Sequence, residues 1–362
     1  MIDSQAFERL RSVGLTTALI QNLAALPAAD EDPSPVLLRV VEVQREGLTL
    51  HDGVGEHAAR LLPALRHALS DAGDAIAVGD WVLARRNALA EWWVEQRVPP
   101  INQLARRLHD GRDKVTRVVI VSNVDTALLV MGLDHDFSLR RLERFVALVQ
   151  MAQVTPVVVL TKADLCADVA ARVAEVQALL PPQASVVAVN ALSDTASAAL
   201  QPWLQSGQTL VLLGSSGTGK STLTNTLTGS DVAIIGANRS DDSRGRHTTT
   251  ARSLHRTADG ACIIDTPGLR TLRLDAEASA LGAAFADVAQ LAGGCRFRDC
   301  QHAGEPGCAV RGAVSTDRLK NYNKLQREAR RDTLTALERK MQVQQWKSRG
   351  RHARTRAEAK RG

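Results

Sequence analysis

The sequence predicts an α/β protein, with a mostly parallel sheet at its centre, a small β-barrel before it and a cysteine-rich helical module after it. Short runs of Val, Ile and Leu alternate with amphipathic helical stretches from residue 115 to residue 265. Residues 36–46 and 76–97 are instead rich in strand-forming residues broken by Gly and Asp. Three of the five cysteines crowd into residues 295–308 beside a histidine.

A chain of 362 residues is too long for one ordinary domain, and 44% hydrophobic and 23% charged residues are typical of a globular protein. We expect an N-terminal arm over 1–34, the barrel over 35–112, the sheet domain over 113–290, a metal-binding domain over 291–345 and a basic tail over 346–362. Residues 57–72 interrupt the barrel pattern with apolar positions at helical or loop spacing.

The positive charge of the chain is concentrated at its C-terminal end. Residues 339–362 hold nine Lys or Arg against the single acid Glu358, so that the rest of a chain of net charge +6 is close to −2. A basic tail predicts a polyanionic partner, with nucleic acid favoured over membrane because no apolar face accompanies the charges. A solvated end without a partner is the alternative.

The N-terminus and the cysteines predict a cytoplasmic protein. MIDSQAFERL has no basic stretch followed by an apolar run, and no apolar segment is long enough to cross a membrane. Closely spaced Cys and His residues suit metal binding in a reducing compartment better than disulfides.

Residues 214–221 read GSSGTGKS and match the phosphate-binding pattern GxxxxGK[ST], between a predicted strand at 209–213 and a helix that begins at Lys220. Backbone N–H groups of this loop would surround the β-phosphate, Lys220 would meet the β- and γ-phosphates, and the Ser221 hydroxyl would ligate Mg²⁺. A chance glycine-rich turn is disfavoured by the flanking elements. The predicted nucleotide contacts here are Gly214, Ser215, Ser216, Gly217, Thr218, Gly219, Lys220, Ser221 and Thr222.

The sequence DTPG at 265–268 follows another apolar strand and completes the phosphate site. Asp265 would hold magnesium through water, and the Gly268 N–H would meet the γ-phosphate. Pro-Gly turns after strands are common, so this motif gains its weight from the P-loop that precedes it.

The sequence TKAD at 161–164 has the form of a guanine-reading motif. Asp164 can accept hydrogen bonds from the N1–H and N2 amine of guanine, whereas adenine offers neither donor and would leave the carboxylate unpaired. Lys162 would pack its aliphatic stem over the base, and Asn190 and Ala191 would supply backbone contacts to the guanine oxygen. In isolation, TKAD could equally be a strand-to-helix cap.

The order of these motifs is unusual, because the base motif precedes the P-loop. This circularly permuted order, with GRHTTT at 245–250, DTPGL at 265–269 and CRFRDCQHAGEPGCAV at 295–310, resembles the ribosome small-subunit-dependent GTPase A (RsgA) family. The resemblance implies an N-terminal OB-fold, a permuted P-loop GTPase domain and a C-terminal zinc-binding domain.

The resemblance further implies a GTP hydrolase that acts in late maturation of the small ribosomal subunit, is activated by that subunit and is released after hydrolysis. Its partners would be the small subunit with its rRNA and GTP or GDP, with no membrane, and we expect a monomer. Two residues depart from common GTPase patterns: Thr161 replaces Asn, and Asn190 replaces Ser in the second base loop. Because Thr lacks the amide that ties neighbouring loops together, we expect somewhat weaker guanine affinity.

Leu269 stands where many small GTPases place the Gln that orients the attacking water. His247 is the nearest polar candidate for that role, and Thr248 or Thr249 would complete the magnesium shell. His247 could instead order its loop or contact rRNA. In either case the missing Gln predicts slow intrinsic turnover and dependence on an activating partner.

Cys295, Cys300, His302 and Cys308 form a complete tetrahedral ligand set with no open position. The set predicts one structural Zn²⁺ rather than a catalytic one, and cysteines packed as small hydrophobic residues are the alternative. Three of the five tryptophans lie in the barrel near several arginines, a composition that suits either an RNA-binding surface or a core.

Two other functional classes fit single features. An RNA-binding assembly factor that holds nucleotide only as a structural ligand would explain Leu269. A P-loop kinase or ATPase would explain the phosphate motif alone, but TKAD disfavours it.

Overall fold

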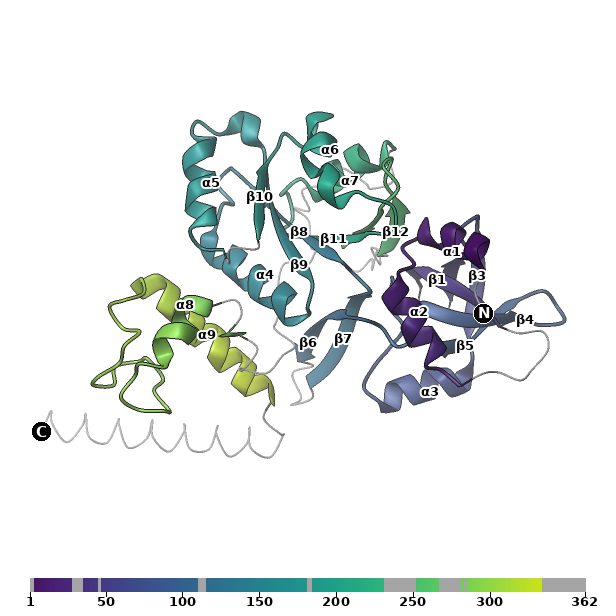
Figure 1. The fold of residues 1–362 in the computed structure, drawn as a ribbon, viewed down its shortest axis with the longest axis horizontal. Coiled ribbons are helices and arrows are strands. Elements are labelled where there is room, and N and C mark those ends of the chain that lie inside the picture. Colours follow the sequence, from purple (N-terminus) through teal and green to yellow (C-terminus); the bar gives the residue numbers. More distant parts are fainter. Residues whose placement is uncertain are drawn as a thin grey trace, which may run out of the picture. The chain divides into compact units, whose positions relative to one another are not determined.

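A computed structural model describes residues 3–27, 35–44, 47–109, 115–180, 184–230, 252–266, 281–282 and 285–333 (Figure 1). The chain divides into two compact units. The first combines residues 1–106 with 118–272, and the second combines 107–117 with 273–362. Each unit is described by itself.

The first unit begins with two short helices, α1 (Ser4–Arg11) and α2 (Thr17–Ala24). Both start at side-chain caps, because Asp3 accepts a hydrogen bond from the Ala6 N–H and Thr16 accepts one from the Leu19 N–H. These caps satisfy N–H groups that have no partner within the first turn of a helix.

The predicted barrel is present. Its five strands run in the order β1-β2-β3-β5-β4, and β4 pairs back onto β1 to close it. Alternate residues point inward around a core that includes Leu38, Leu50 and Val94. The strands are β1 (Val36–Val43), β2 (Leu48–His51), β3 (Glu56–Leu61), β4 (Trp81–Arg86) and β5 (Trp92–Arg97).

The interruption expected over residues 57–72 is only partly correct. Residues 56–61 form strand β3, and helix α3 (Pro63–Asp71) follows with Pro63 in its first turn. Proline suits that position because the N–H it lacks would have no partner within the helix. The short strand was missed because the polar residues of EHAARL blur its alternation.

A parallel sheet in the order β10-β9-β8-β11-β13 forms the rest of the first unit, and β12 adds an antiparallel edge (Figure 1). The central strands are buried on both faces and therefore read as continuous apolar runs. The strands are β8 (Thr126–Gly132), β9 (Thr155–Thr161), β10 (Ser185–Ala188), β11 (Thr209–Leu213), β12 (Ser253–Arg256) and β13 (Cys262–Asp265).

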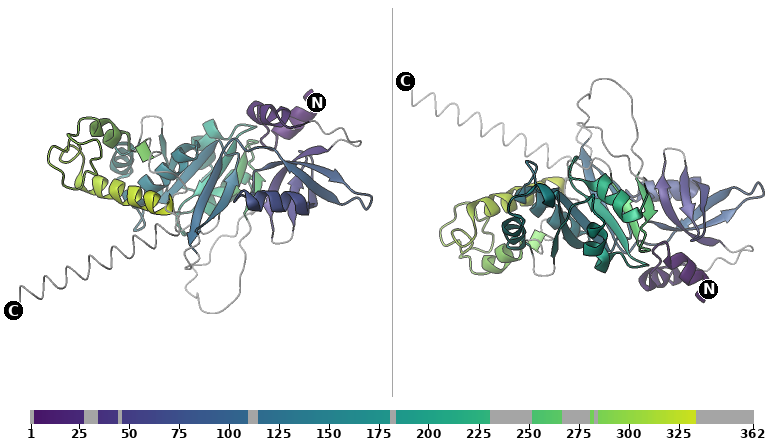
Figure 2. Two further views of the ribbon diagram at one scale, coloured as in Figure 1. Left: turned by 90° about the horizontal axis from the view of Figure 1, so that it is seen from below. Right: turned by 90° about the horizontal axis from the view of Figure 1, so that it is seen from above.

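Helices cover both faces of this sheet. Leu128 and Leu210 face a core cluster that includes Leu200 of α6 and Leu223 of α7, whereas α4 packs on β8 and β9 and contributes no residue to that cluster. Figure 2 gives two further views of this layering. The helices are α4 (Leu139–Met151), η1 (Ala163–Leu165), α5 (Val169–Gln177), α6 (Thr195–Leu200), η2 (Gln201–Trp203) and α7 (Lys220–Thr228).

The run at 115–122 is a strand, as predicted, but it does not join the parallel sheet. Strand β7 (Val115–Ser122) pairs with β6 (Gln103–His109) in a two-stranded sheet of its own. Because the apolar residues of β7 resemble those of the central strands, the sequence predicted that β7 would join the parallel sheet. That prediction is wrong.

The barrel and the sheet are joined within the first unit. Strand β1 pairs with β12 at Glu42 and Ser253, so that hydrogen bonding continues from one sheet into the other. Nearby, the fully buried Arg39 donates to the carbonyl oxygens of Val13 and Asn123 and lies over the Trp81 ring at 5.5 Å. One buried guanidinium therefore contacts the N-terminal arm, the barrel and the segment that leads into β8.

The second unit contains α8 (Ala286–Ala292) and α9 (Thr316–Thr333), with the cysteine-rich segment between them. Arg318 of α9 binds Asp287 through two hydrogen bonds of 2.7 and 2.8 Å, and Phe285 meets Tyr322 edge to face at 5.3 Å. Helix α9 agrees with the helical module that the sequence predicted in this part of the chain, and the positions after 333 lie outside the described residues.

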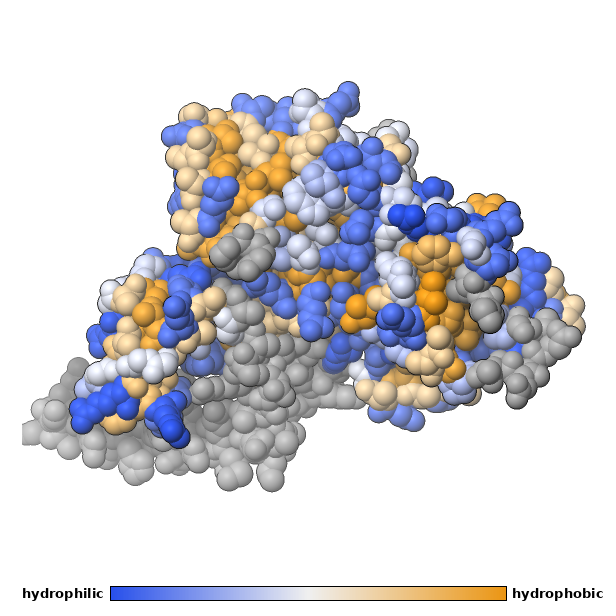
Figure 3. All heavy atoms as spheres, viewed as in Figure 1, coloured by the Kyte–Doolittle hydropathy of each residue, from blue (hydrophilic) through white to orange (hydrophobic). Residues whose placement is uncertain are grey.

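Among the described residues, no helix is long and apolar enough to cross a membrane. Figure 3 shows hydrophobic residues gathered over α5 and β10, and hydrophilic residues spread between them and the barrel.

Candidate functional site

The predicted P-loop connects β11 to α7 at the carboxyl edge of the parallel sheet. Gly217 and Gly219 have φ angles of 81° and 88°, in the left-handed region that favours glycine. Gly214 lies so close to β8 that a Cβ atom there would meet the Val130 carbonyl oxygen at 2.3 Å. The glycine spacing read from the sequence is therefore required by this backbone.

Lys220 is 7% exposed, and its ammonium group donates to the carbonyl oxygens of Gly214 and Ser215 at 2.9 and 2.5 Å. Burial lowers the pKa of Lys220, and the charge of Asp265 acts in the opposite direction. The side chain thus lies curled against the loop whose N–H groups are expected to receive phosphate.

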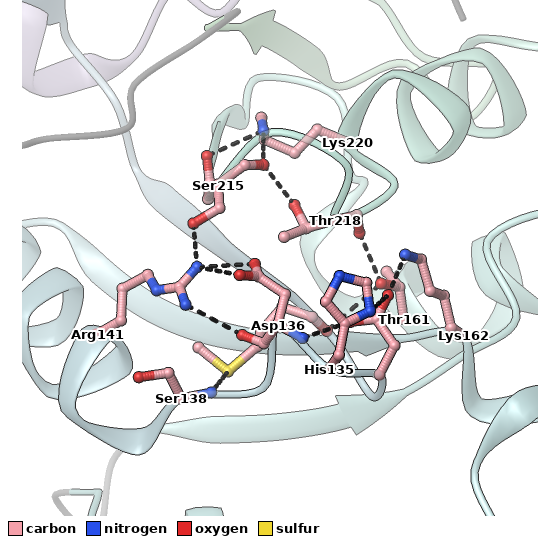
Figure 4. Close-up of polar contacts among 12 residues, drawn as sticks. His135, Asp136, Ser138, Arg141, Thr161, Lys162, Ser215, Thr218 and Lys220 are labelled. Atoms are coloured by element: carbon pink, nitrogen blue, oxygen red, sulfur yellow. Dashed lines mark hydrogen bonds and ion pairs between the residues drawn. The ribbon is translucent and has the colours of Figure 1, made fainter. Parts of the chain in front are cut away.

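The base motif begins at the end of β9, which is separated from β11 by β8 in the parallel sheet. The Thr161 hydroxyl donates to the Thr218 carbonyl oxygen at 2.6 Å and thereby links this motif to the P-loop (Figure 4). The sequence predicted that Thr161 would not tie the two loops together, because it lacks the amide of Asn. The Thr161 hydroxyl makes this link in place of the amide, because a short side chain is long enough where the two loops lie this close.

Asp164 stands at the start of η1 with its side chain exposed. In the second base loop, the Asn190 side chain accepts from the Leu192 N–H at 3.0 Å, and the Ala191 carbonyl oxygen accepts from Thr226 of α7 at 2.7 Å. Both base loops are therefore fastened to elements that carry or flank the P-loop.

The structure adds residues that the sequence did not predict. They lie in the loop between β8 and α4 and in the first turn of α4. Asp134 pairs with Lys162 at 2.5 Å, and Arg141 bonds both Asp136 and the Ser215 hydroxyl (Figure 4). The sequence did contain a pattern that could have identified this loop. Asp134 and Asp136 come directly after a buried parallel strand, and ligand sites of open α/β sheets lie at that end of the strands.

Asp265 ends β13 and is 9% exposed. Its Oδ1 atom has no hydrogen-bond partner among the described residues, although a buried polar atom normally has one. Burial raises the pKa of Asp265, whereas the charges of Lys220 and His255 lower it. An orphaned buried carboxylate oxygen close to a P-loop suits a hydrated magnesium ion.

Four predicted residues cannot be placed. Gly268, His247, Thr248 and Thr249 lie outside the described residues, as does Leu269. Their assigned roles remain predictions from the sequence.

In the second unit, the ligand atoms of Cys295, Cys300, His302 and Cys308 all lie within 4.8 Å of one another. The His302 Nδ1 atom is 3.7 Å from the sulfur of Cys295 and 3.4 Å from that of Cys308. Tetrahedral zinc bonds of ordinary length separate a sulfur and a nitrogen ligand by about 3.5 Å. The cluster can hold a metal ion, and its spacing suits zinc.

The barrel tryptophans divide between core and surface. Trp81 is fully buried, whereas Trp92 and Trp93 are partly exposed. The guanidinium of Arg86 lies 4.9 Å from the Trp92 ring centre, and that of Arg60 lies 6.0 Å from the Trp93 ring centre. Aromatic rings beside arginines are a common surface for stacking nucleic-acid bases.

Comparisons with known proteins agree with this architecture. The RsgA GTPase family model matches residues 99–275. Small ribosomal subunit biogenesis GTPase RsgA 2 of Vibrio vulnificus is 42% identical over 314 residues, which span 85% of this chain and 86% of the relative. Small ribosomal subunit biogenesis GTPase RsgA of Xylella fastidiosa strain 9a5c is 44% identical over 296 residues, 80% of this chain and 84% of the relative.

Two solved structures share the fold. YjeQ from Thermotoga maritima matches with a TM-score of 0.59 at 24% identity, over 81% of this chain and 98% of that one. YloQ, a circularly permuted GTPase, matches with a TM-score of 0.58 at 22% identity, over 85% of this chain and 99% of that one. The permuted fold predicted from the motif order is confirmed.

With sequence identity above 40% over four fifths of the chain and a matching family model, this protein belongs to the RsgA GTPase family and is a GTP-hydrolysing enzyme.

Proposed function

We propose that GTP binds at the carboxyl edge of the parallel sheet, with its phosphates in the P-loop and its base between the two base loops. The supporting observation is the Thr161–Thr218 hydrogen bond of 2.6 Å, which joins the two motifs that would contact opposite ends of one nucleotide. Lys220 lies beside loop carbonyls and gains phosphate oxygens as better acceptors when nucleotide binds.

Guanine selectivity is assigned to Asp164. Its exposed carboxylate can accept from the two donors on the guanine edge, while Lys162, Asn190 and Ala191 support the base from either side. The remaining P-loop positions supply backbone N–H groups to the phosphates, as set out from the sequence.

Ser221 and Asp265, with Thr248 or Thr249, would hold magnesium, which supplies charge neutralisation at the β- and γ-phosphates. His247 is proposed to orient the attacking water, and the Gly268 N–H to contact the γ-phosphate. Because Leu269 cannot orient water, we propose slow turnover that an activating partner accelerates.

The partner is proposed to be the small ribosomal subunit, late in its maturation, with release of the protein after hydrolysis. The relatives, which are small ribosomal subunit biogenesis GTPases, support the choice of this subunit. The arginine-flanked Trp92 and Trp93 and the basic tail support contact with its rRNA. We propose a monomer that works in the cytoplasm, where ribosomal subunits are assembled and cysteines stay reduced.

The cluster of Cys295, Cys300, His302 and Cys308 is proposed to hold one structural zinc ion. Four protein ligands leave no position for water or substrate, which suits a structural rather than a catalytic metal.

GTP turnover should be measured with increasing amounts of small and of large ribosomal subunits, for the unmodified protein and for Lys220→Ala. Small subunits are expected to raise turnover well above the basal rate, large subunits are not, and Lys220→Ala should be inactive throughout. Equal stimulation by large subunits would contradict the assigned partner. Unchanged turnover in Lys220→Ala would contradict the P-loop as the active site.

A further inference from the structure

The loop between β8 and α4, residues 133–138, contacts both halves of the candidate nucleotide site (Figure 4). Asp134 reaches the base motif through its 2.5 Å ion pair with Lys162. At the start of α4, Arg141 reaches the P-loop through the Ser215 hydroxyl. No motif in the sequence assigns a role to this loop.

The loop is ordered by hydrogen bonds within it and by hydrogen bonds from Arg141 of α4. The Arg141 guanidinium donates to both carboxylate oxygens of Asp136 at 2.7 and 2.8 Å, and to the Asp136 carbonyl oxygen at 3.2 Å. The Asp134 carboxylate accepts from the Asp136 N–H at 3.0 Å. The side chains of Arg141 and Asp136 are each 31% exposed, so water screens their hydrogen bonds only in part.

Arg141 bonds the side chain of Ser215, whereas Lys220 bonds the backbone carbonyl of that same residue. The guanidinium therefore holds the P-loop from the α4 side and leaves the backbone N–H groups of the loop available to phosphate. It acts through Ser215 rather than on a nucleotide.

We propose that the β8–α4 loop is a brace that fixes the phosphate and base motifs relative to each other, with Arg141 as the positioning residue for the P-loop. This inference rests on the proposed nucleotide site. A loop already held in its binding conformation loses less conformational entropy when a ligand arrives, and the affinity is correspondingly higher.

The brace makes a specific prediction about affinity. GTP and GDP use the same P-loop, so loss of Arg141 lowers the affinity for both nucleotides by a similar factor. Asp164 is not part of the brace, so the preference for guanine over xanthine nucleotides stays the same.

Equilibrium binding of GDP, of xanthosine diphosphate and of a non-hydrolysable GTP analogue should be compared in Arg141→Met, Ser215→Ala and the double variant. The matched control is Arg140→Met, which changes the adjacent, exposed arginine of α4. Arg141→Met is expected to weaken the binding of both guanine nucleotides about tenfold relative to Arg140→Met. The double variant should bind no more weakly than Arg141→Met, because the two side chains act through one hydrogen bond. Arg141→Lys should recover part of the loss.

Three outcomes would overturn the brace: equal affinity in Arg141→Met and Arg140→Met, full additivity of the Arg141 and Ser215 effects, or a changed guanine-to-xanthine ratio in Arg141→Met. Urea unfolding of the same variants tests a general loss of stability, and an affinity loss that follows the unfolding midpoint would also contradict positioning. Failure of the proposed site looks different, because the unmodified protein would then bind GDP no better than Lys220→Ala does.

Discussion

The Thr161 hydroxyl, the Lys162 ammonium and the Asp164 carboxylate lie within four consecutive positions but have different surroundings. Thr161 is buried against the P-loop, Lys162 pairs with Asp134, and Asp164 is exposed. Burial works to raise the pKa of Asp134, but the hydrogen bond and charge of Lys162 outweigh it, and the pKa lies below its ordinary value. Of the two acids, Asp164 is thus the one open to a nucleotide.

Asp164→Asn is expected to weaken GTP binding by roughly 100-fold or more, because two charge-assisted hydrogen bonds to guanine are lost. The same change should improve xanthosine triphosphate, whose C2 oxygen can accept from the new amide. Competition binding of GTP, ATP and xanthosine triphosphate measures both effects. Asp259→Asn, at an exposed acid in the turn between β12 and β13, serves as the control. Equal affinity of the unmodified protein for ATP and GTP would refute the assignment of the base.

Among the elements, β1 links the barrel to the edge of the parallel sheet. It closes the barrel on β4 and pairs with β12 at the edge of the parallel sheet. The turn before β4 lies at this junction, where Gly79, with a φ of 93°, accepts from the Asn123 side-chain amide at 3.0 Å. A Cβ atom at Gly79 would meet the Ser122 carbonyl oxygen at 2.1 Å, so only glycine fits.

Asp80 at this junction should make the stability of the fold depend on pH. Burial raises its pKa to about 6, against the opposing effects of the Ala77 N–H and Arg97. An acid whose pKa is higher in the folded state binds more protons there than in the unfolded state. The free energy of unfolding therefore falls as the pH rises from about 4 through 6, by up to about 3 kcal/mol from this group.

Asp80→Asn removes that titration while its amide oxygen can still accept from the Ala77 N–H. The difference in free energy of unfolding between the variant and the unmodified protein should shift in favour of the variant between pH 4.5 and pH 7. Urea unfolding at the two pH values measures it. A difference that is the same at both would show that Asp80 does not titrate in this range.

The cysteine-rich segment between α8 and α9 is predicted to depend on its metal, because so short an element has little core of its own. We expect about one zinc per chain by elemental analysis, and loss of ordered structure in this segment in Cys300→Ser. GTP affinity without ribosomes should not change, because the described nucleotide-site residues all belong to the first unit. Less than about half an equivalent of zinc, in protein never exposed to chelator, would contradict the zinc assignment.

For the whole molecule, the positive charge at the C-terminal end is expected to affect binding to the ribosomal subunit rather than binding of the nucleotide. The basic tail lies outside the described residues, and its sequence holds a single acid, Glu358, among its lysines and arginines. Truncation after Gln345 should weaken binding to small subunits and flatten its salt dependence, because fewer counterions are released. GTP affinity without ribosomes should be unaffected. Equally tight binding by the truncated and full chains, at both low and physiological salt, would leave the tail as a solvated end.

The nucleotide motifs, their permuted order and the four Cys and His residues that could hold a metal ion follow from the amino-acid sequence alone. Each of these depends on residue types at short, fixed spacing, and the backbone geometry they require is local. The glycines of the P-loop are an example, since Gly217 and Gly219 have positive φ angles that other residues rarely adopt.

Which distant segments meet is visible in the folded chain and not in the sequence. Strand β7 was predicted as a strand, but local propensity does not specify a pairing partner, and β6 pairs with it instead of the parallel sheet. The contact of Arg141 with Ser215 joins residues 74 positions apart, and that of Asp134 with Lys162 joins residues 28 apart. Neither follows a local pattern, because the order of strands in the sheet brings these loops together.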